Sequence, residues 1–402
     1  MSSRMKFLVV SASTCLTVLL LVGSVWSQSS GKDDTYKHIG VFSDVVGYIK
    51  EQYVEEPDMK GVTLGALNGM LEAVDPFASY LNAEQYSDYQ KNKDAKRADV
   101  GLILSKKFGY VGVVDAIPGS PADKAGFTTG DMIESIKGIS TRDMPLAYAA
   151  ILLQGESNTP VELSVVRVRH PDPQNVTLMR ANPVLPAIET QVLPNQVGYV
   201  KVGALSPSQL KDIRTAIEKL TKDGAKKLII DVRRCAVGTP EDGIALANMF
   251  LDKGKITYVK GQRYPEQDFE ADPSKAITTL PVAFLTNHGT ANGAEIAAAA
   301  IEDNKRGSVI GDHTYGDAAI RKPIGTEDGG AIILSVAKYY SPSGKAIQDV
   351  TVAPTQQVAE QEPTVDFDEN GEPIPSTETA KPENKRLDDD PVVKKALEVL
   401  NG

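Results

Sequence analysis

The feature that most restricts the fold is an alternation of apolar strands and amphipathic helices between residues 181 and 355. The runs KKLIIDVR and VAFLTN contain the continuously apolar stretches LII and VAFL, which are typical of strands buried on both faces. We expect a helix at residues 206–224, capped by Ser206 or Ser208 and ended by Gly224. Strands that alternate with helices predict a layered α/β core.

Four further segments differ in composition from this core. Residues 33–97 carry apolar side chains at helical spacing and predict an N-terminal helical region. Residues 98–180 contain short β-type runs and Pro/Gly turns, which predict a small β-rich barrel with two helices. Residues 356–388 are rich in Glu, Pro and Thr and predict a disordered linker, and residues 389–402 predict a capped C-terminal helix.

The first 27 residues read as a signal peptide or an uncleaved N-terminal anchor. Arg4 and Lys6 precede an uncharged apolar run that ends near Val25. Either interpretation predicts export to the periplasm or cell envelope, with membrane attachment only through this segment. Once the segment that contains Cys15 is removed, Cys235 is alone and no intrachain disulfide can form. The net charge of −10, without a long basic run, argues against nucleic-acid binding.

Five motifs occur in a fixed order along the chain: EQYVEEPDMKGVTLGALNGMLEAVDPFASYL, IPGSPADKAGFTTGDMIESIKG, KKLIIDVRR, GAEIAAAAIEDNKRGSVIGDHTYGDA and AKYYSPSGKAIQ. In this order they resemble the carboxyl-terminal processing peptidases, also called tail-specific proteases. The resemblance implies an N-terminal dimerisation region, an inserted PDZ domain and a crotonase-like α/β protease core. It also implies a catalytic serine and lysine, a glutamine that supports the lysine, and no cofactor.

The catalytic residues of the family do not carry over to this sequence. The family's nucleophile turn S-A-S-A-S-E matches residues 290–295, which places Asn292 at the serine position. The motif GDHTYG places Asp317 at the lysine position and Arg321 at the glutamine position. The loop that supplies oxyanion donors reads DVRRCAVG, so Val237 replaces one glycine of the family and Gly238 keeps the other.

Hydrolysis by the family route needs a nucleophile that can lose a proton to a base. An Asn292 amide cannot act in this way, and an Asp317 carboxylate adds negative charge beside a developing oxyanion. We therefore expect a pseudoprotease in which Asn292 serves as the N-cap of a helix. A replacement dyad of Cys235 with His288 or His313 is a rival hypothesis.

Two further readings of single residues are weaker. Thr290 is a possible substitute nucleophile, but it lacks an evident base. Cys235, Asp312 and the two histidines match no compact zinc spacing, so we expect no metal site.

The segment DVGLIL is the candidate for peptide binding in the PDZ-like region. PDZ domains add a peptide as a strand and capture its terminal carboxylate with backbone amides. Asp99 is electrostatically unfavourable beside such a site. The candidate residues are Val100, Gly101, Leu102 and Leu104 on the loop and strand, and Tyr148 and Leu152 on the facing helix. The alternative is that these side chains only complete the core of the small domain.

The sequence thus predicts an exported, non-hydrolytic protein that binds peptide C-termini or partner proteins. It is expected to form a homodimer, or a heterodimer with an active relative. The first alternative is an active carboxyl-terminal processing endopeptidase of the serine type or dependent on Cys235. The second is a purely structural envelope protein with a vestigial PDZ domain.

Overall fold

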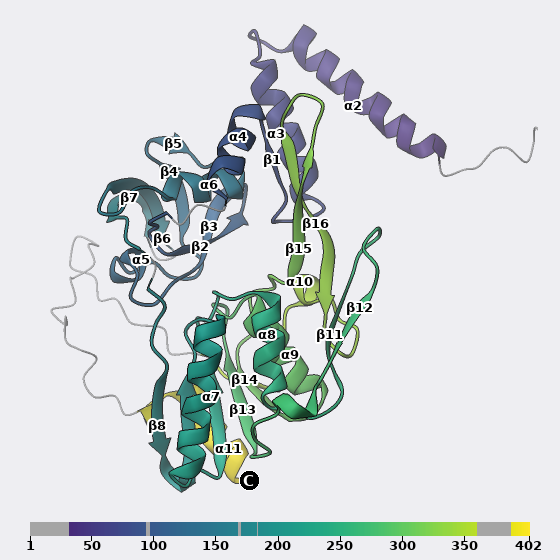
Figure 1. Ribbon diagram of the computed structural model, residues 1–402. Helices are drawn as coiled ribbons and strands as arrows, with labels where there is room; N and C mark the ends of the chain where they lie inside the picture. The colour runs from purple at the N-terminus through teal and green to yellow at the C-terminus, as the bar shows by residue number, and fades with distance from the viewer. Residues whose placement is uncertain (1–31, 94–96, 168–169, 183, 360–386) are drawn as a thin grey trace, which may run out of the picture. The chain divides into compact units, whose positions relative to one another are not determined.

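The computed structural model describes residues 32–93, 97–167, 170–182, 184–359 and 387–402 (Figure 1). The leader predicted at residues 1–27 and most of the linker predicted at 356–388 lie outside these residues. The chain divides into two compact units, residues 1–66 and residues 67–402. In the described part of the chain, no helix combines the length and the hydropathy of a membrane span.

The region predicted as helical at residues 33–97 contains three helices, α2 (Lys32–Gln52), α3 (Met59–Glu72) and α4 (Ala83–Asn92). It also contains a strand, which corrects the all-helical prediction. Strand β1 (Ser79–Leu81) pairs antiparallel with β16 (Ala331–Tyr340), and all three of its residues are buried. A three-residue strand shows no measurable periodicity, and its partner lies about 250 residues away in the sequence.

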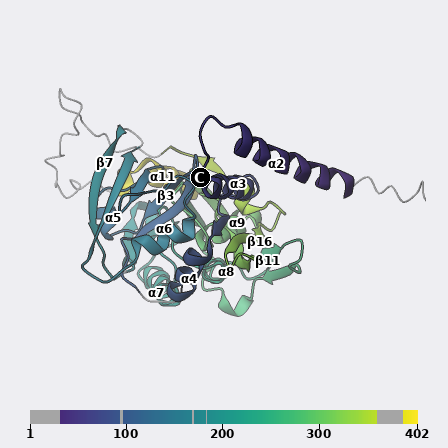
Figure 2. The same ribbon diagram turned by 90° about the horizontal axis from the view of Figure 1, so that it is seen from above.

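The small domain at residues 98–180 is built on an antiparallel sheet in the order β2-β3-β4-β6-β7, with β5 paired to β4. Figure 2 shows α5 and α6 beside this sheet. Its elements are β2 (Leu102–Lys107), β3 (Tyr110–Ala116), α5 (Pro121–Lys124), β4 (Met132–Ile136), β5 (Ile139–Ser140), α6 (Leu146–Leu153), β6 (Pro160–Arg167) and β7 (His170–Met179). Strand β2 lies at one edge of the sheet and packs against α6.

The core is built on a six-stranded sheet in the order β17-β14-β13-β10-β9-β8, parallel except for β8. Its elements are β8 (Glu189–Leu193), the 3-10 helix η1 (Pro194–Gln196), β9 (Val197–Lys201), α7 (Pro207–Lys222), β10 (Lys227–Asp231), α8 (Pro240–Asn248), η2 (Pro273–Lys275), β13 (Val282–Thr286), α9 (Gly293–Asp303), β14 (Gly307–Gly311), β17 (Gln356–Gln357), η3 (Leu387–Asp389) and α11 (Pro391–Asn401).

A second sheet joins β16 to β1, β11 (Lys255–Lys260), β12 (Gln267–Glu270) and β15 (Ala319–Gly325), and the short helix α10 (Ile347–Val350) packs against β16. The expected helix at 206–224 is α7, and Ser206 is its N-cap. Strand β17 begins inside the segment that we predicted as a linker, which is a correction to that boundary.

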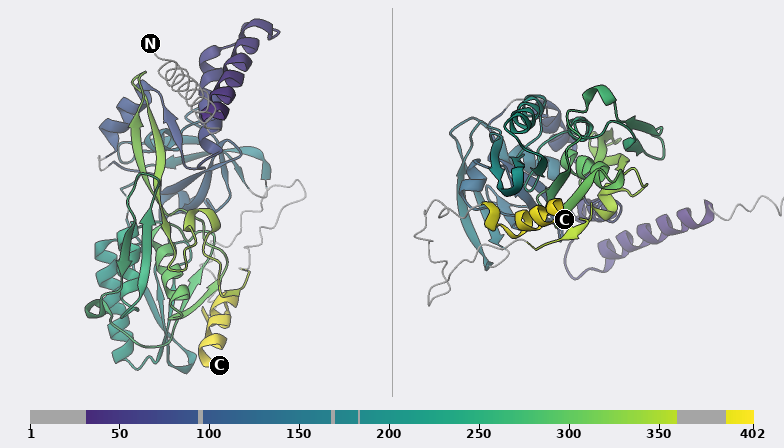
Figure 3. Two further views of the ribbon diagram at one scale, coloured as in Figure 1. Left: turned by 90° about the vertical axis from the view of Figure 1, so that its right-hand side faces the viewer. Right: turned by 90° about the horizontal axis from the view of Figure 1, so that it is seen from below.

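Consecutive residues of β10 face opposite layers of the core. Leu228 and Ile230 belong to the cluster that includes the apolar faces of α7, α8 and α9. Ile229 belongs to a separate cluster with Val392 and Val393 of α11. Figure 3 shows α11, in yellow, on the side of the sheet away from α7. This layered arrangement confirms the α/β core predicted from the alternation of strands and helices.

Candidate functional site

Three loops meet at the carboxyl edge of the core sheet, where β10, β13 and β14 end side by side. Neighbouring parallel strands end at one edge, which is the usual place of a site in an α/β fold. Ala291 donates its amide to the carbonyl of Cys235 at 3.1 Å, which joins the loops after β13 and β10. Tyr315 donates its amide to the carbonyl of Thr290 at 2.9 Å, which joins the loop after β14. Thr290 is fully buried, and its hydroxyl donates to the carbonyl of Val232 at 2.9 Å.

Asn292 lies at the N-cap position of α9 in a backbone conformation that non-glycine residues rarely adopt. Its φ is 57° and its ψ is −125°. The following turn is crowded, because a Cβ on Gly293 would lie 2.3 Å from the carbonyl oxygen of Thr239. A sharp strand-turn-helix of this kind presents the residue at its tip, and Asn292 is half-buried. The structure thus has a sharp strand-turn-helix with an amide side chain at its tip.

Glu295 links the loops of the site, although the sequence motifs did not single it out as functional. Its carboxylate is fully buried and accepts four hydrogen bonds. One oxygen accepts the amides of Asn292, at 2.9 Å, and Asp317, at 2.8 Å. The other accepts the Thr314 hydroxyl and the amide of Gly316, at 2.7 Å. One oxygen of Glu295 thus holds the backbones of Asn292 and Asp317 close together.

The environment of Glu295 contains opposing influences on its ionisation. Burial raises the pKa of the carboxyl to about 7, while hydrogen bonds from Thr314, Asp317 and Gly316 favour the ionised form and limit that rise. An acidic residue inside the apolar run AEIAAAAI is the signal that could have identified it, because an acid is rarely fully buried without partners.

Asp317 and Arg321, the residues that the sequence predicts at the lysine and glutamine positions, form an ion pair. The Arg321 guanidinium lies 2.6 Å from the Asp317 carboxylate, and both side chains are largely buried. The guanidinium also stacks 4.2 Å from the ring centroid of Phe77 and lies 3.5 Å from the side-chain oxygen of Gln348. A carboxylate held by a guanidinium cannot replace the neutral amine that the serine mechanism needs as base.

The loop after β10 holds the two residues at the expected oxyanion positions. The carbonyl of Val237 accepts the amide of Leu205 at 2.7 Å. Gly238 has a φ of 148°, and a Cβ at this position would lie 2.6 Å from the Cβ of Leu205. Packing against Leu205 therefore requires glycine at position 238. The side chain of Val237 limits the backbone conformations that its own peptide unit can adopt.

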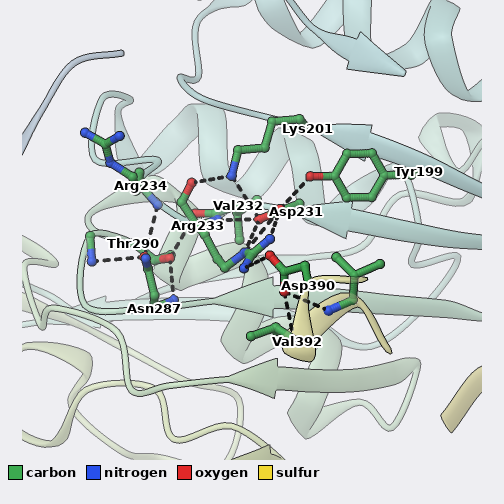
Figure 4. Close-up of polar contacts among 12 residues, drawn as sticks. Tyr199, Lys201, Asp231, Val232, Arg233, Arg234, Asn287, Thr290, Asp390 and Val392 are labelled. Carbon is green, nitrogen blue, oxygen red and sulfur yellow. Dashed lines mark hydrogen bonds and ion pairs between the residues drawn. The ribbon is translucent and has the colours of Figure 1, made fainter. Parts of the chain in front are cut away.

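Asp231, at the end of β10, anchors the start of this loop through polar contacts (Figure 4). It is fully buried and binds the Tyr199 hydroxyl at 2.6 Å, the Lys201 ammonium at 3.2 Å and the Arg233 guanidinium at 2.7 Å. Burial alone would raise the pKa of Asp231, but Lys201 and Arg233 outweigh burial and hold that pKa well below its usual range. Arg233 also binds Asp390 at the start of α11, at 2.9 Å. This network connects the loop to the C-terminal helix.

Arg234 extends in another direction, to the small domain. Its guanidinium lies within 3.1 Å of both oxygens of Asp115 on β3 and 2.9 Å from Asp123 on α5. Its backbone amide donates to the side chain of Asn287 at 3.0 Å, as Figure 4 shows. One residue of the oxyanion loop therefore binds both the nucleophile loop and the small domain.

Strands β2 and β3 cover this edge of the core. Ile103 and Val114 pack against Ala236 of the oxyanion loop, Ala291 of the nucleophile turn and Tyr315. Val114 and Ala291 are almost completely buried by this contact. The small domain thus lies directly on the loops that carry the candidate site residues.

Cys235 does not form a dyad with either histidine in this structure. Its thiol is fully buried, and burial raises its pKa to about 12. His288 lies 3.4 Å from the carboxylate of Asp312, and His313 lies 3.2 Å from the hydroxyl of Thr351. The geometry favours the interpretation of Cys235 as an inert core residue. Within the described ranges, no three His, Cys, Asp or Glu side chains are arranged to hold a metal ion.

The six candidate peptide-binding residues gather around β2 and α6. Val100 is fully buried and Leu102 nearly so, whereas Leu104 is half-buried against the same small-domain core. Tyr148 and Leu152 of α6 are half-buried and pack against this cluster. The edge strand, the adjoining helix and the glycine loop have the arrangement that strand addition requires, and the same side chains also complete the core of the small domain.

Comparisons with known proteins agree with this architecture. The family model of the S41 peptidases matches residues 196–358, and the PDZ domain model matches residues 112–167. The carboxy-terminal-processing protease of Bartonella bacilliformis is 28% identical over 348 residues, which cover 85% of this chain and 80% of that protein. The carboxyl-terminal-processing protease of Synechocystis is 30% identical over 345 residues, which cover 84% and 79%.

Among solved structures, the photosystem II D1 C-terminal processing protease aligns with a TM-score of 0.64 and 26% identity, over 79% of this chain and 86% of that one. This structural similarity and the two family models confirm the predicted combination of an α/β peptidase fold with a PDZ domain. On these grounds, the chain belongs to the carboxyl-terminal-processing proteases of peptidase family S41.

Proposed function

We propose that this family member is a pseudoprotease that binds peptide C-termini without cleaving them. The observation that carries the proposal is the pairing of Asp317 with Arg321 at 2.6 Å, beside a nucleophile turn that presents Asn292. Acyl transfer needs a nucleophile, a base and aligned oxyanion donors at one point. Here the first two positions hold side chains without that chemistry, and Val237 stands at the third.

The alternative is an active peptidase that uses other residues of the same cleft. Cys235 is the rival nucleophile, but its thiol is fully buried and its raised pKa leaves almost no thiolate at neutral pH. The small domain also covers the loops that a substrate carbonyl would have to reach. These observations favour binding over hydrolysis.

The test is incubation of the purified protein with an unstructured protein substrate, followed by mass spectrometry of the products. We expect no cleavage, no labelling by a fluorophosphonate and no labelling of Cys235 by iodoacetamide. Cleavage that is lost in Asn292→Ala, Cys235→Ala or Thr290→Ala protein would establish the active alternative. Cleavage that persists in all three variants would indicate a contaminating protease.

A restoration series sharpens this test. Asn292→Ser alone should remain inactive, because its hydroxyl would face no amine base. The combination with Asp317→Lys and Arg321→Gln restores the family's three side chains, and Val237→Gly restores the oxyanion loop. Any activity that appears should need at least the serine and the lysine together. Activity in the single Asn292→Ser variant would show that another base already lies in the cleft.

Export and self-association form the remaining part of the proposal. The apolar segment near the N-terminus supports export, and the family resemblance of the N-terminal helices supports a homodimer or a heterodimer with an active relative. Fusion of residues 1–30 to a reporter that is active only after export tests the first point. Analytical ultracentrifugation of the full chain tests the second.

A further inference from the structure

The carboxylate-binding loop of the PDZ domain already holds a carboxylate of its own chain. One side-chain oxygen of Asp99 accepts the backbone amides of both Val100 and Gly101, the latter at 2.9 Å. These are two of the three residues whose amides the sequence assigns to a ligand's terminal carboxylate. Asp99 is half-buried, so its side chain also borders solvent.

The loop is held in place by its carbonyls, which are used inside the domain. The carbonyl of Val100 accepts the amide of Ala122 at 2.9 Å, and the carbonyl of Gly101 accepts the amide of Ile117 at 2.8 Å. A Cβ on Gly101 would lie 2.3 Å from the Cβ of Ser120, so the loop lies directly on the turn before α5. A carboxylate that bound the amides of Val100 and Gly101 in this fixed loop would take the place of the Asp99 oxygen.

The backbone of Asp99 is held independently of its side chain. Asp99 and Ala181 exchange two backbone hydrogen bonds, at 3.0 Å and 2.9 Å. The side chain can therefore rotate away from the loop, or be removed, while the backbone stays in place. This separates the role of the carboxylate in ligand competition from a role in folding.

We propose that Asp99 is an intramolecular competitor of ligand C-termini, and that a peptide binds through its terminal carboxylate only after displacing it. The inference rests on the proposed peptide-binding function of the PDZ domain. It assigns the competition to occupation of the two amides as well as to repulsion between like charges. It follows that the native protein should distinguish poorly between a free C-terminus and an amidated one.

The experiment compares four proteins by fluorescence anisotropy: the native chain, Asp99→Ala, Asp99→Asn and the control Asp172→Ala. Asp172 lies exposed on β7 of the same domain, so its removal changes the net charge equally. The probes are fluorescein-labelled octapeptides ending in Val, Leu or Ala, each with a free carboxylate and as the amide. Melting temperatures are measured for all four proteins to establish that each is folded.

The expected result is about tenfold tighter binding of the free carboxylate by Asp99→Ala, equivalent to ~1.4 kcal/mol, with binding of the amide unchanged. The Asp99→Asn side chain keeps an oxygen that can accept both amides, so it should recover clearly less affinity than Asp99→Ala. The Asp172→Ala protein should bind like the native chain.

Three outcomes would overturn the inference. Equal affinities of the native and Asp99→Ala proteins for the free carboxylate would show that Asp99 does not compete with the ligand. The proposed peptide-binding function would be unaffected by that result. Equal gains in Asp99→Asn and Asp99→Ala would reduce the effect to charge repulsion and refute occupation of the amides. Absence of binding in every folded protein would refute the peptide-binding function itself.

Discussion

Glu295 and Asp99 both accept backbone amides, and the two carboxylates differ in burial and in the number of their donors. Glu295 is fully buried in the core with four donors, whereas Asp99 is half-buried in the PDZ domain with two. Water cannot replace the donors of a fully buried carboxylate, so its contacts fix the fold around it. A half-buried carboxylate can exchange its donors for water, and can therefore yield its place to a ligand.

The comparison separates a structural contact from an exchangeable one. Around Glu295, the backbones of Asn292 and Asp317 are held together by one buried carboxylate. This contact has a structural role whether or not the site is catalytic. Around Asp99, a half-buried carboxylate occupies the loop that we propose for peptide binding.

The largest effect is expected for Glu295→Gln. The substituted amide directs an NH2 group at two hydrogen-bond donors, so the variant should lose about 4 kcal/mol of unfolding free energy. Urea unfolding followed by circular dichroism measures this loss. The control is Glu302→Gln, which lies farther along α9 and is half-buried, and should change stability by less than about 1 kcal/mol. Equal losses in both variants would contradict the structural role assigned to Glu295.

Asp231→Asn should cost about 3 kcal/mol at neutral pH, because it breaks a buried network of charges. The pKa of Asp231 is lowered by folding, so the ionised group stabilises the native state above its unfolded pKa of about 3.9. That stabilisation is lost as the pH falls below this value. The difference in unfolding free energy between the native protein and Asp231→Asn should therefore become smaller as the pH falls below about 4.

Asp212→Asn is the matched control for that pH series, since Asp212 is exposed on α7. Its stability should follow the native curve at every pH. A gap between the native protein and Asp231→Asn that widened in acid would show that Asp231 is protonated in the native state at neutral pH.

Asp317→Ala should have a smaller effect on stability, of about 1–2 kcal/mol, because it leaves Arg321 largely buried without its carboxylate partner. The double variant Asp317→Ala/Arg321→Ala should lose less than the sum of the two single variants, since the pair is then removed as a unit. A double-mutant cycle in urea measures this coupling. Strict additivity of the two single losses would show that the contact between Asp317 and Arg321 contributes nothing to the stability of the fold.

Cys235 is expected to react far more slowly with a thiol reagent in the folded protein than in the unfolded chain. Because burial raises its pKa from 9.0 to about 12, the folded protein should contain about a thousandfold less thiolate than the unfolded chain. Reaction with Ellman's reagent at pH 8, with and without urea, measures the difference. Rapid labelling of the folded protein would revive the cysteine-dependent alternative.

Much of the fold could be predicted from local sequence. The apolar residues of β10 and β13 and the apolar face of α7 indicate by their spacing which side chains are buried. Strand β1 could not be predicted, since its three residues are defined only by pairing with β16. The same holds for the site. Motif matching singled out Asn292 and Asp317 as candidate site residues. The four hydrogen bonds to Glu295 could not be predicted, because they come from loops that meet only in the folded chain.

Asp99 illustrates a second limit of sequence reasoning. Its charge indicated an unfavourable neighbour for a ligand carboxylate, but the sequence did not show that its oxygen already accepts the amides of the loop. Such a contact depends on the side-chain rotamer and on the left-handed backbone of Gly101, at a φ of 81°. Neither quantity is encoded in a motif.

Native mass spectrometry of the Asp99→Ala protein, after long incubation with an octapeptide that ends in a free carboxylate, tests the central claim most directly. The account predicts a non-covalent complex of unchanged protein with the intact peptide. A shortened peptide, or an acyl adduct on the protein that disappears in Asn292→Ala or Cys235→Ala background, would contradict it.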